Sequence, residues 1–513
     1  MCTIQPSLKE KPTFSQPSRA ETLGAEHSGS RTVARHRRRS AMTAMHRKSS
    51  HERSTRGFFI FLVLFYLLGT GEHLSWGQES VLDRGPSPDS VLELNSPLDV
   101  AFLPLAPVPW ALTALKDRLH ASLKPQLETL PPFFRDTQLG MNLRMYYFDR
   151  ENHVQPPESD NEAFTIGGSL YYRSGWLADT FRMGLEVFGS QKLYGPENRD
   201  GTLLLRPGQK SYGVLGVAYG EFQYENYNVQ LFRQYIDTPY VNQQDNRMTP
   251  NTFEAYIIRG KYDWGQFGAG YIAQIKPRNA SAFTSMSEQA GAPPGRERGM
   301  GTAGIRFTPT KDISFGAINY YVPDTFNTFY TEGNYTWPLT EKLGLKLQGQ
   351  FTEQDSVGGD YLIGKFNTRV GGAEAALSYN NTILRTAFSV TANTGNILTP
   401  YGTYPGYLSL MEQFFNRAGE KAWLLGFSYD FKDYVKGLST TFNFARGVDA
   451  VDPATKSGVP NENEWDITFD YRIEEGPLRG IWVRLRNAYV KFNSGGGNSN
   501  NVRLIINYPL PFL

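Results

Sequence analysis

The alternation of apolar and polar residues is clearest in the last thirteen residues, Asn501–Leu513. One row of side chains is apolar and comprises Val502, Leu504, Ile506, Tyr508, Leu510 and Phe512. The opposite row is more polar and comprises Arg503, Ile505, Asn507, Pro509 and Pro511. A period of two predicts a β-strand with two different faces. Such a strand at the chain end is typical of the closing strand of an outer-membrane barrel, and the edge strand of a soluble β-sandwich is the alternative.

The same short alternating runs continue through most of the chain from residue 139 onward, and they predict eighteen strands. The predicted ranges are 139–149, 163–174, 178–190, 210–224, 227–235, 253–260, 264–275, 298–308, 312–321, 325–338, 341–354, 362–379, 382–392, 421–432, 438–447, 463–472, 479–492 and 501–513. An even number of strands is what a closed bacterial barrel with both termini at one rim requires.

The connections between the predicted strands alternate in length. Tight turns are predicted at 225–226, 261–263, 309–311, 338–340 and 380–381. Long loops are predicted at 191–209, 236–252, 276–297, 393–420 and 448–462. Short turns at one rim and long loops at the other are typical of an outer-membrane barrel, whereas a soluble sandwich has no reason for this regularity. The connection at 322–324 is an exception, because it is short where a long loop is expected.

Several strands place their charges on one row. In 463–472, Glu464, Asp466 and Asp470 oppose a row of aromatic and aliphatic residues. An Arg or Lys facing lipid at mid-depth costs about 2–4 kcal/mol, so charged rows must face water. A barrel of about 16–18 strands encloses an aqueous channel rather than a packed core. The pattern therefore predicts an all-β fold, a transmembrane antiparallel β-barrel of about 18 strands.

Composition agrees with this class without proving it. Aromatic residues make up 14% of the chain and glycines number 50, yet the mean hydropathy is −0.43. The net charge of +2 arises in the first 77 residues, since the remainder holds 40 basic and 45 acidic residues. The basic character therefore gives no indication of nucleic-acid binding. The single cysteine, Cys2, also lies in this leader, which fits an oxidising compartment for the rest of the chain.

The N-terminal part is predicted to consist of two segments. Residues 1–77 form a leader with a signal peptide, whose apolar core is 58–69 and whose small residues Ser75 and Gly77 fit cleavage after Gly77. A retained membrane anchor is the alternative, but twelve apolar residues are too few to span a bilayer. Residues 78–132 form a Pro-rich periplasmic segment with an amphipathic helix between Trp110 and Leu127, and 133–513 form the barrel.

Two stretches resemble the OprD family of outer-membrane porins. Pro132–Glu151 reads PFFRDTQLGMNLRMYYFDRE and is similar to the opening strand of that family. Gln234–Gly260 reads QYIDTPYVNQQDNRMTPNTFEAYIIRG and is similar to its third loop and the following strand. The chain departs from the family pattern at its end, where Leu513 replaces the usual terminal aromatic residue and two prolines lie in the last strand.

The resemblance implies a function and a setting. It implies a porin of the bacterial outer membrane, monomeric or homotrimeric, inserted into lipid by the barrel-assembly machinery, that passes small hydrophilic solutes by diffusion. It implies a basic wall that favours carboxylate-bearing solutes such as amino acids or organic acids, and a third loop that narrows the channel. In this chain that constriction loop is 236–252, with Pro239, Asp245 and Arg247. A non-conducting structural or adhesin-like barrel is the alternative.

The candidate solute-binding residues are basic side chains that the alternation assigns to the lumen. They are Arg144, Arg173, Arg182, Lys346, Arg369, Arg385, Arg484, Arg486 and Arg503. A guanidinium group offers a planar set of donors to a passing carboxylate, and a series of weak sites lets a solute enter and still leave. The alternative is that these residues pair with Asp466, Asp470, Glu186 or Glu374 and hold the wall in shape. Likewise, Asp245 and Arg247 either line the narrowest point or bond the loop backbone.

Signals for an enzyme are weak. Gly299–Gly304 matches GxGxxG, but it lies in a strand-like run without the helix that binds a pyrophosphate. The sequence contains no HExxH or GxSxG motif and no Cys/His cluster, and His153 is the only histidine after residue 132. We therefore predict a protein that is not an enzyme and that uses no metal or other cofactor.

Overall fold

The computed structural model describes residues 110–513 except 155, 157 and 477. The predicted leader and most of the segment 78–132 lie outside these residues. The described chain contains one 19-stranded sheet. Its strands are β1 Gln138–Val154, β2 Asn161–Arg173, β3 Phe181–Tyr194, β4 Tyr212–Tyr224, β5 Tyr227–Gln234, β6 Thr252–Tyr262, β7 Gly265–Lys276, β8 Thr284–Ser285, β9 Met300–Thr310, β10 Ile313–Val322, β11 Phe326–Pro338, β12 Leu343–Ser356, β13 Asn367–Tyr379, β14 Thr382–Thr391, β15 Lys421–Asp430, β16 Leu438–Val448, β17 Glu462–Arg472, β18 Trp482–Phe492 and β19 Gly497–Pro511.

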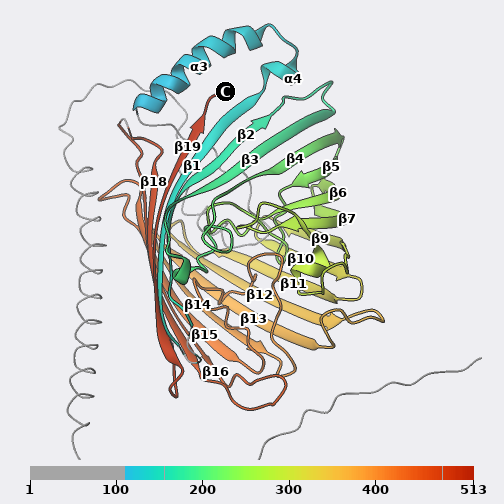
Figure 1. The fold of residues 1–513 in the computed structure, drawn as a ribbon, viewed down its shortest axis with the longest axis vertical. Helices are drawn as coiled ribbons and strands as arrows, with labels where there is room; N and C mark the ends of the chain where they lie inside the picture. Colours follow the sequence, from blue (N-terminus) through green and yellow to red (C-terminus); the bar gives the residue numbers. More distant parts are fainter. Residues whose placement is uncertain (1–109, 155, 157, 477) are drawn as a thin grey trace, which may run out of the picture. The chain divides into compact units, whose positions relative to one another are not determined.

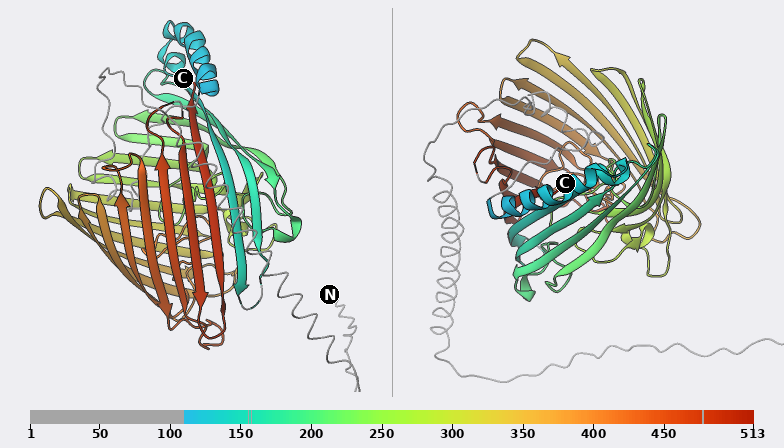
Figure 2. Two further views of the ribbon diagram at one scale, coloured as in Figure 1. Left: turned by 90° about the vertical axis from the view of Figure 1, so that its left-hand side faces the viewer. Right: turned by 90° about the horizontal axis from the view of Figure 1, so that it is seen from above.

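The sheet closes on itself as a barrel (Figures 1 and 2). Each long strand pairs antiparallel with its neighbours in sequence, and β19 pairs with β1 from Gly140↔Pro511 to Val154↔Gly497. The two-residue strand β8 pairs only with the end of β7, which pairs directly with β9. Eighteen strands therefore form the wall, one at each of the predicted positions. Closure satisfies the backbone groups that an open edge would leave unpaired in lipid.

The two rims differ as the sequence indicates. Tight turns join β4 to β5, β6 to β7, β9 to β10 and β13 to β14, and long loops join β3 to β4, β5 to β6, β7 to β9, β14 to β15 and β16 to β17. The connection between β10 and β11 is only Pro323–Thr325, as predicted for this exceptional position. Both ends of the barrel chain lie at the rim of the short turns.

The wall has an apolar outer row and a polar inner row. On β12, Leu347 is 42% exposed on the outside, whereas its neighbour Lys346 is only 6% exposed on the inside. Aromatic side chains gather on the outer row near each rim. Tyr262 stacks on Trp264 at the turn rim, and Trp423 contacts Phe444 near the loop rim. Such aromatic girdles mark the two membrane interfaces of an outer-membrane barrel.

Two helices precede β1 at the turn rim. The helix α3, Trp110–Glu128, occupies the range where the sequence predicts a helix, and the short helix α4 spans Pro132–Arg135. The ring of Phe133 in α4 stacks on Phe181 of β3 with centroids 6.5 Å apart. In α3, Nδ1 of His120 lies 3.3 Å from the carbonyl oxygen of Phe512. Among the described residues, no helix combines the length and the apolar character needed to cross a membrane.

The two prolines of the closing strand occupy a half-paired part of β19. Pairing between β18 and β19 ends at Trp482↔Asn507, so Pro509 and Pro511 pair only with β1. A proline lacks the N–H that a strand with neighbours on both sides requires, and edge positions tolerate it. The prolines are therefore compatible with a closing strand, and backbone bonds between Leu139 and residues 512–513 complete the seam.

Candidate pore constriction

The β5–β6 loop, residues 235–251, folds into the barrel instead of projecting from it (Figure 1). Its Tyr240 is buried, and its ring packs against Tyr320, Tyr330 and Tyr404 with centroids 6.0–6.4 Å apart. The hydroxyl of Tyr240 donates to Oγ1 of Thr352 on β12 at 2.9 Å. The loop thus crosses the interior and is anchored on the opposite wall by packing and neutral hydrogen bonds.

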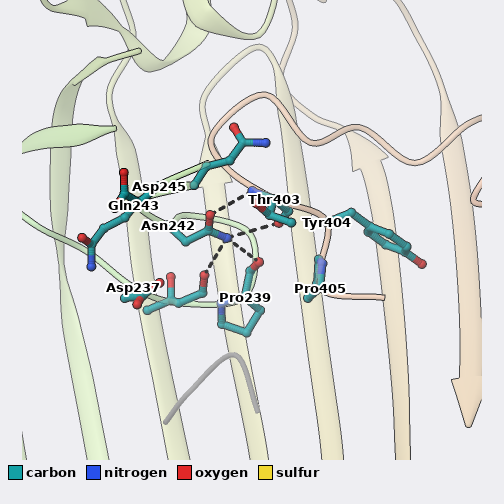
Figure 3. A pocket seen from close by; sticks show the side chains of 10 residues that line it. Asp237, Pro239, Asn242, Gln243, Asp245, Thr403, Tyr404 and Pro405 are labelled. Atoms are coloured by element: carbon teal, nitrogen blue, oxygen red, sulfur yellow. Dashed lines mark hydrogen bonds between the residues drawn. The ribbon is translucent and has the colours of Figure 1, made fainter. Parts of the chain in front are cut away.

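The β14–β15 loop, residues 392–420, enters the barrel from another side and meets the first loop. The side-chain amide of Asn242 donates to the carbonyl oxygen of Thr403 at 3.2 Å and accepts from its N–H at 2.8 Å. A cavity of about 400 Å³ lies at this contact (Figure 3). Most of the residues that line this cavity are polar. They are Asp237, Thr238, Pro239, Asn242, Gln243, Gln244, Asp245, Thr403, Tyr404 and Pro405. The two loops therefore meet inside the barrel.

Asp245 and Arg247 of the predicted constriction loop play different parts. Nη1 of Arg144 on β1 lies 2.6 Å from Oδ1 of Asp245, so this ion pair ties the loop to the wall. The side chain of Asp245 is 44% exposed and also lines the cavity. Arg247 is buried, and its Nε donates to the carbonyl oxygen of Thr202 at 2.8 Å. Arg247 therefore bonds loop backbone, whereas Asp245 lines the cavity and pairs with a side chain of the wall.

Five guanidinium groups lie near one another inside the barrel, three on β18 and β19 and two in the β5–β6 and β7–β8 connections, and we call them the arginine row. It comprises Arg278, Arg247, Arg503, Arg486 and Arg484. Arg486 and Arg503 face each other in the register of β18 and β19. Burial lowers the pKa of Arg278 to about 10, and repulsion from Arg503 contributes to this lowering. Burial likewise lowers the pKa of Arg247, assisted by Arg503 and Arg278. The row therefore concentrates positive charge.

The members of the arginine row differ in their partners. Arg484 pairs with Asp470 at 2.6 Å and lies over the ring of Trp482. Arg503 pairs with Glu412 of the loop 392–420 and is only 2% exposed. Arg486 is partly exposed, and Nε donates to Oγ1 of Thr468 at 3.0 Å. Within the described chain, Arg486 has no carboxylate within ion-pair distance.

The remaining predicted lumen residues lie on the inner row, with one exception. Arg182 pairs with Glu221 at 2.6 Å, and Arg385 pairs with Glu374 at 3.3 Å. Arg173 lies at the end of β2 and Lys346 on β12, where its charge acts on Glu374. These residues are closer to the turn rim than Arg503 is, and they are spread around the wall. Apart from Arg484, Arg486 and Arg503, the predicted set is therefore not gathered in one place.

The prediction that Arg369 faces the lumen is wrong. Its neighbours Thr368 and Val370 are buried on the inner row, so Arg369 belongs to the outer row. Its side chain is 65% exposed, and Nη2 lies 2.6 Å from Oε1 of Glu353 on the adjacent strand. Arg369 is the third residue of β13, close to the loop rim. At that depth a basic residue on the outer face costs only about 0–1 kcal/mol, because it reaches the polar headgroup region.

A row of carboxylates on β17 binds the tip of the loop 392–420. Glu464 accepts from the backbone N–H groups of Glu412 and Gln413 at 2.8 and 2.7 Å. Asp466 accepts from the N–H of Met411 at 3.0 Å. Carboxylates that accept backbone N–H groups form strong, charge-assisted hydrogen bonds. This row, predicted only to face water or pair with arginines, therefore fixes the loop tip beside Arg503.

Three residues of this region were not named as candidates from the sequence, although Asp237 lies within the predicted constriction loop 236–252. Arg278, Glu412 and Asp237 all lie in connections, where no strand periodicity assigns a side chain to the lumen. Asp237 lines the cavity, and burial raises its pKa to about 6. Among the described residues, no group of three or more His, Cys, Asp or Glu side chains is placed to hold a metal ion.

Fold and site together define an outer-membrane porin, a closed barrel with a polar interior into which two long loops fold. The model of the OprD family of outer membrane porins matches residues 131–512, and the chain belongs to this family. The protein is accordingly one of the bacterial outer membrane. The strand positions, the barrel class and the family resemblance drawn from the sequence are thereby confirmed.

Individual relatives are distant in sequence and close in fold. Porin D of Pseudomonas aeruginosa is 23% identical over 431 residues, covering 74% of this chain and 92% of the relative. Porin-like protein GalP of Pseudomonas putida is 22% identical over 396 residues, covering 74% and 93%. The crystal structure of OpdK from P. aeruginosa with vanillate has a TM-score of 0.66 at 20% identity, covering 74% of this chain and all of OpdK. OccK9 (OpdG) of P. aeruginosa reaches 0.68 at 22% identity with the same coverage.

Proposed function

We propose that this porin favours small carboxylate-bearing solutes, such as organic acids or amino acids, and that Arg486 is their principal contact in the arginine row. Arg486 carries the proposal because no carboxylate of the described chain lies within ion-pair distance of it, whereas Arg484 and Arg503 each have such a partner. The nearby Asp466 attracts Arg486 only from a longer distance. A solute carboxylate would replace the missing partner. The guanidinium presents donors in a fixed plane, which suits a bidentate contact.

The surroundings of Arg486 support a transient contact rather than tight binding. The positive charges of Arg484 and Arg503 on either side attract an anion, and Asp470 and Glu412 offset part of that attraction. A channel needs sites that are favourable enough to enter and weak enough to leave. Vanillate, with which the OpdK crystal structure was determined, is itself a carboxylate, so one relative of the same fold agrees with this solute class.

Single-channel recording of the purified protein in planar bilayers tests the proposal with two probes of equal shape, benzoate and its neutral analogue benzamide. We expect benzoate to block the current and benzamide to block it far less. The substitution Arg486→Gln removes a charge-assisted contact and should weaken the block by benzoate about tenfold, with little change for benzamide.

The matched control is Arg369→Gln, which removes an arginine from the outer row of the same barrel. It should leave the block by benzoate unchanged. Equal block by the two probes, or block by benzoate that Arg486→Gln does not weaken, would contradict the proposed solute preference.

A further inference from the structure

The carboxylate of Glu412 occupies the middle of the arginine row. One oxygen, Oε1, receives hydrogen bonds from Arg503 and from the amide of Asn501, the latter at 3.1 Å. The other oxygen, Oε2, lies 3.1 Å from Nη1 of Arg150 on β1. The side chain of Glu412 is 8% exposed and that of Arg503 only 2%. A carboxylate from a loop thus fills a site built by two guanidinium groups and an amide.

The main chain on both sides of Glu412 is held independently of its side chain. Glu464 binds the N–H groups of residues 412 and 413, and Asp466 binds the N–H of Met411. The carbonyl oxygen of Met411 accepts from Nη2 of Arg503 at 3.3 Å. The loop tip therefore delivers the carboxylate to a fixed place, and the side chain can be changed while these contacts remain.

We propose that Glu412 is a specificity-determining residue that acts as a tethered competitor: its carboxylate occupies the binding site of Arg503 and Arg150 and so limits the affinity of the pore for solute carboxylates. The inference rests on the proposed function and extends it, since it concerns the same arginine row. It explains why a wall so rich in arginine would not hold an anion tightly. With Glu412 in place, a passing solute would have to compete with a carboxylate for Arg503 and Arg150, whereas Arg486 has no carboxylate within ion-pair distance in the described chain.

The test is the isosteric substitution Glu412→Gln, recorded in planar bilayers with benzoate as the probe. The amide keeps an oxygen that can accept from Arg150 or Asn501, and it removes the negative charge. We expect the concentration of benzoate that gives half-block to fall about tenfold, because the neutral amide no longer competes with the benzoate carboxylate for charge-assisted hydrogen bonds to Arg503 and Arg150. The reversal potential in a KCl gradient should shift towards chloride selectivity.

Two further variants separate a site effect from a general charge effect. Glu353→Gln is the matched control, because Glu353 is also paired with an arginine but lies on the outer row. It should change neither quantity. In the double variant Glu412→Gln with Arg503→Gln, the gain in benzoate affinity should disappear, since Arg503 is the group that Glu412 occupies. A gain that persists in the double variant would overturn the proposal, as would Glu412→Gln with unchanged block.

The outcome also distinguishes this inference from the proposed function. If the unmodified pore shows no preference for benzoate over benzamide, the proposed function fails. The tethered competitor would still be supported if Glu412→Gln then gains block by benzoate that depends on Arg503. If the unmodified pore prefers benzoate through Arg486 and Glu412→Gln changes nothing, the proposed function stands and the tethered competitor is rejected.

Discussion

The two loops that meet inside the barrel are held by different forces. The loop 235–251 is anchored by a buried tyrosine, Tyr240, which packs among other tyrosines and donates to Thr352. The tip of the loop 392–420 is instead held by the carboxylates Glu464 and Asp466, and it carries Glu412 to Arg503. Both loops place buried aromatic side chains in the interior, such as Tyr240 of the first loop and Tyr401 and Phe415 of the second, so the difference lies in the charged contacts of the second loop's tip. The comparison indicates that charge-assisted hydrogen bonds matter more for the position of the second loop's tip than for the anchor of the first loop at Tyr240.

Loss of the carboxylates Glu464 and Asp466 on β17 should change the conductance of the channel most. The double substitution Glu464→Ala with Asp466→Ala leaves three backbone N–H groups without acceptors, and each loss costs about 1–3 kcal/mol when the group stays buried. We expect the loop tip to leave the wall, with a higher mean conductance and larger fluctuations of the open-channel current. Single-channel recording measures both quantities.

The control for this change is Asp470→Ala on the same inner row. Asp470 pairs with Arg484 and Trp482, and its bonds among the described residues do not include the loop 392–420. It should alter ion selectivity without adding current fluctuations. Equal fluctuations in both variants would show that the loop tip does not depend on Glu464 and Asp466.

Titration of Asp237 should have an intermediate effect. Burial raises its pKa from 3.8 to about 6, so the carboxyl group is neutral below about pH 6 and negative above it. As the pH falls through 6, the cavity loses a negative charge, and the reversal potential in a KCl gradient should shift towards chloride. Asp237→Asn should show this shifted value at pH 7 and lack the transition. The same transition in Asp237→Asn would assign it to another group.

The same pKa shift has a consequence for stability. Because the folded state holds the proton of Asp237 more tightly than the unfolded state, this group lowers the free energy of unfolding as the pH rises from about 4 to 6. Asp237→Asn removes that loss, so its stability relative to the unmodified protein should be higher above pH 6 than at pH 4.

The smallest effect is expected from Tyr240→Phe, which removes one neutral hydrogen bond and keeps the ring. Stability should fall by about 1 kcal/mol, and thermal unfolding in detergent measures the change. Conductance and ion selectivity should remain as they are, because aromatic packing still holds the loop. A marked rise in conductance would show that the bond to Thr352, and not packing, anchors the loop 235–251.

The sequence predicts the strands of the barrel wall better than the loops and ion pairs inside the barrel. A strand with one face toward water and the other toward lipid alternates strongly in side-chain polarity, and this alternation predicts all eighteen strands of the wall. The contrast fails on β13, where Gly371, Gly372 and several alanines make both rows small. There the inner row includes the apolar Val370, and the parity of Arg369 was misjudged for that reason.

The constriction itself depends on loops, and loops carry no such periodicity. Arg484, Arg486 and Arg503 were predicted because they lie on strands with clear rows. Glu412 and Arg278 lie far from them in sequence, and only the inward course of two connections brings them to the arginine row. The sequence also left undecided whether a predicted arginine is paired or open, since Asp470 and Glu412 pair with Arg484 and Arg503 but not with Arg486.

The seam between β1 and β19 has a consequence for the order of folding. It joins residues from opposite ends of the barrel chain, such as Gly140 and Pro511. Bringing these residues together costs loop-closure entropy, and contacts between residues so far apart in sequence form slowly. Arg144 and Arg150 lie on one side of the seam, and Asn507 and Arg503 on the other. The cluster of Glu412 with Arg150 and Arg503 can therefore be completed only when the seam closes, and an intermediate with an open seam would lack it.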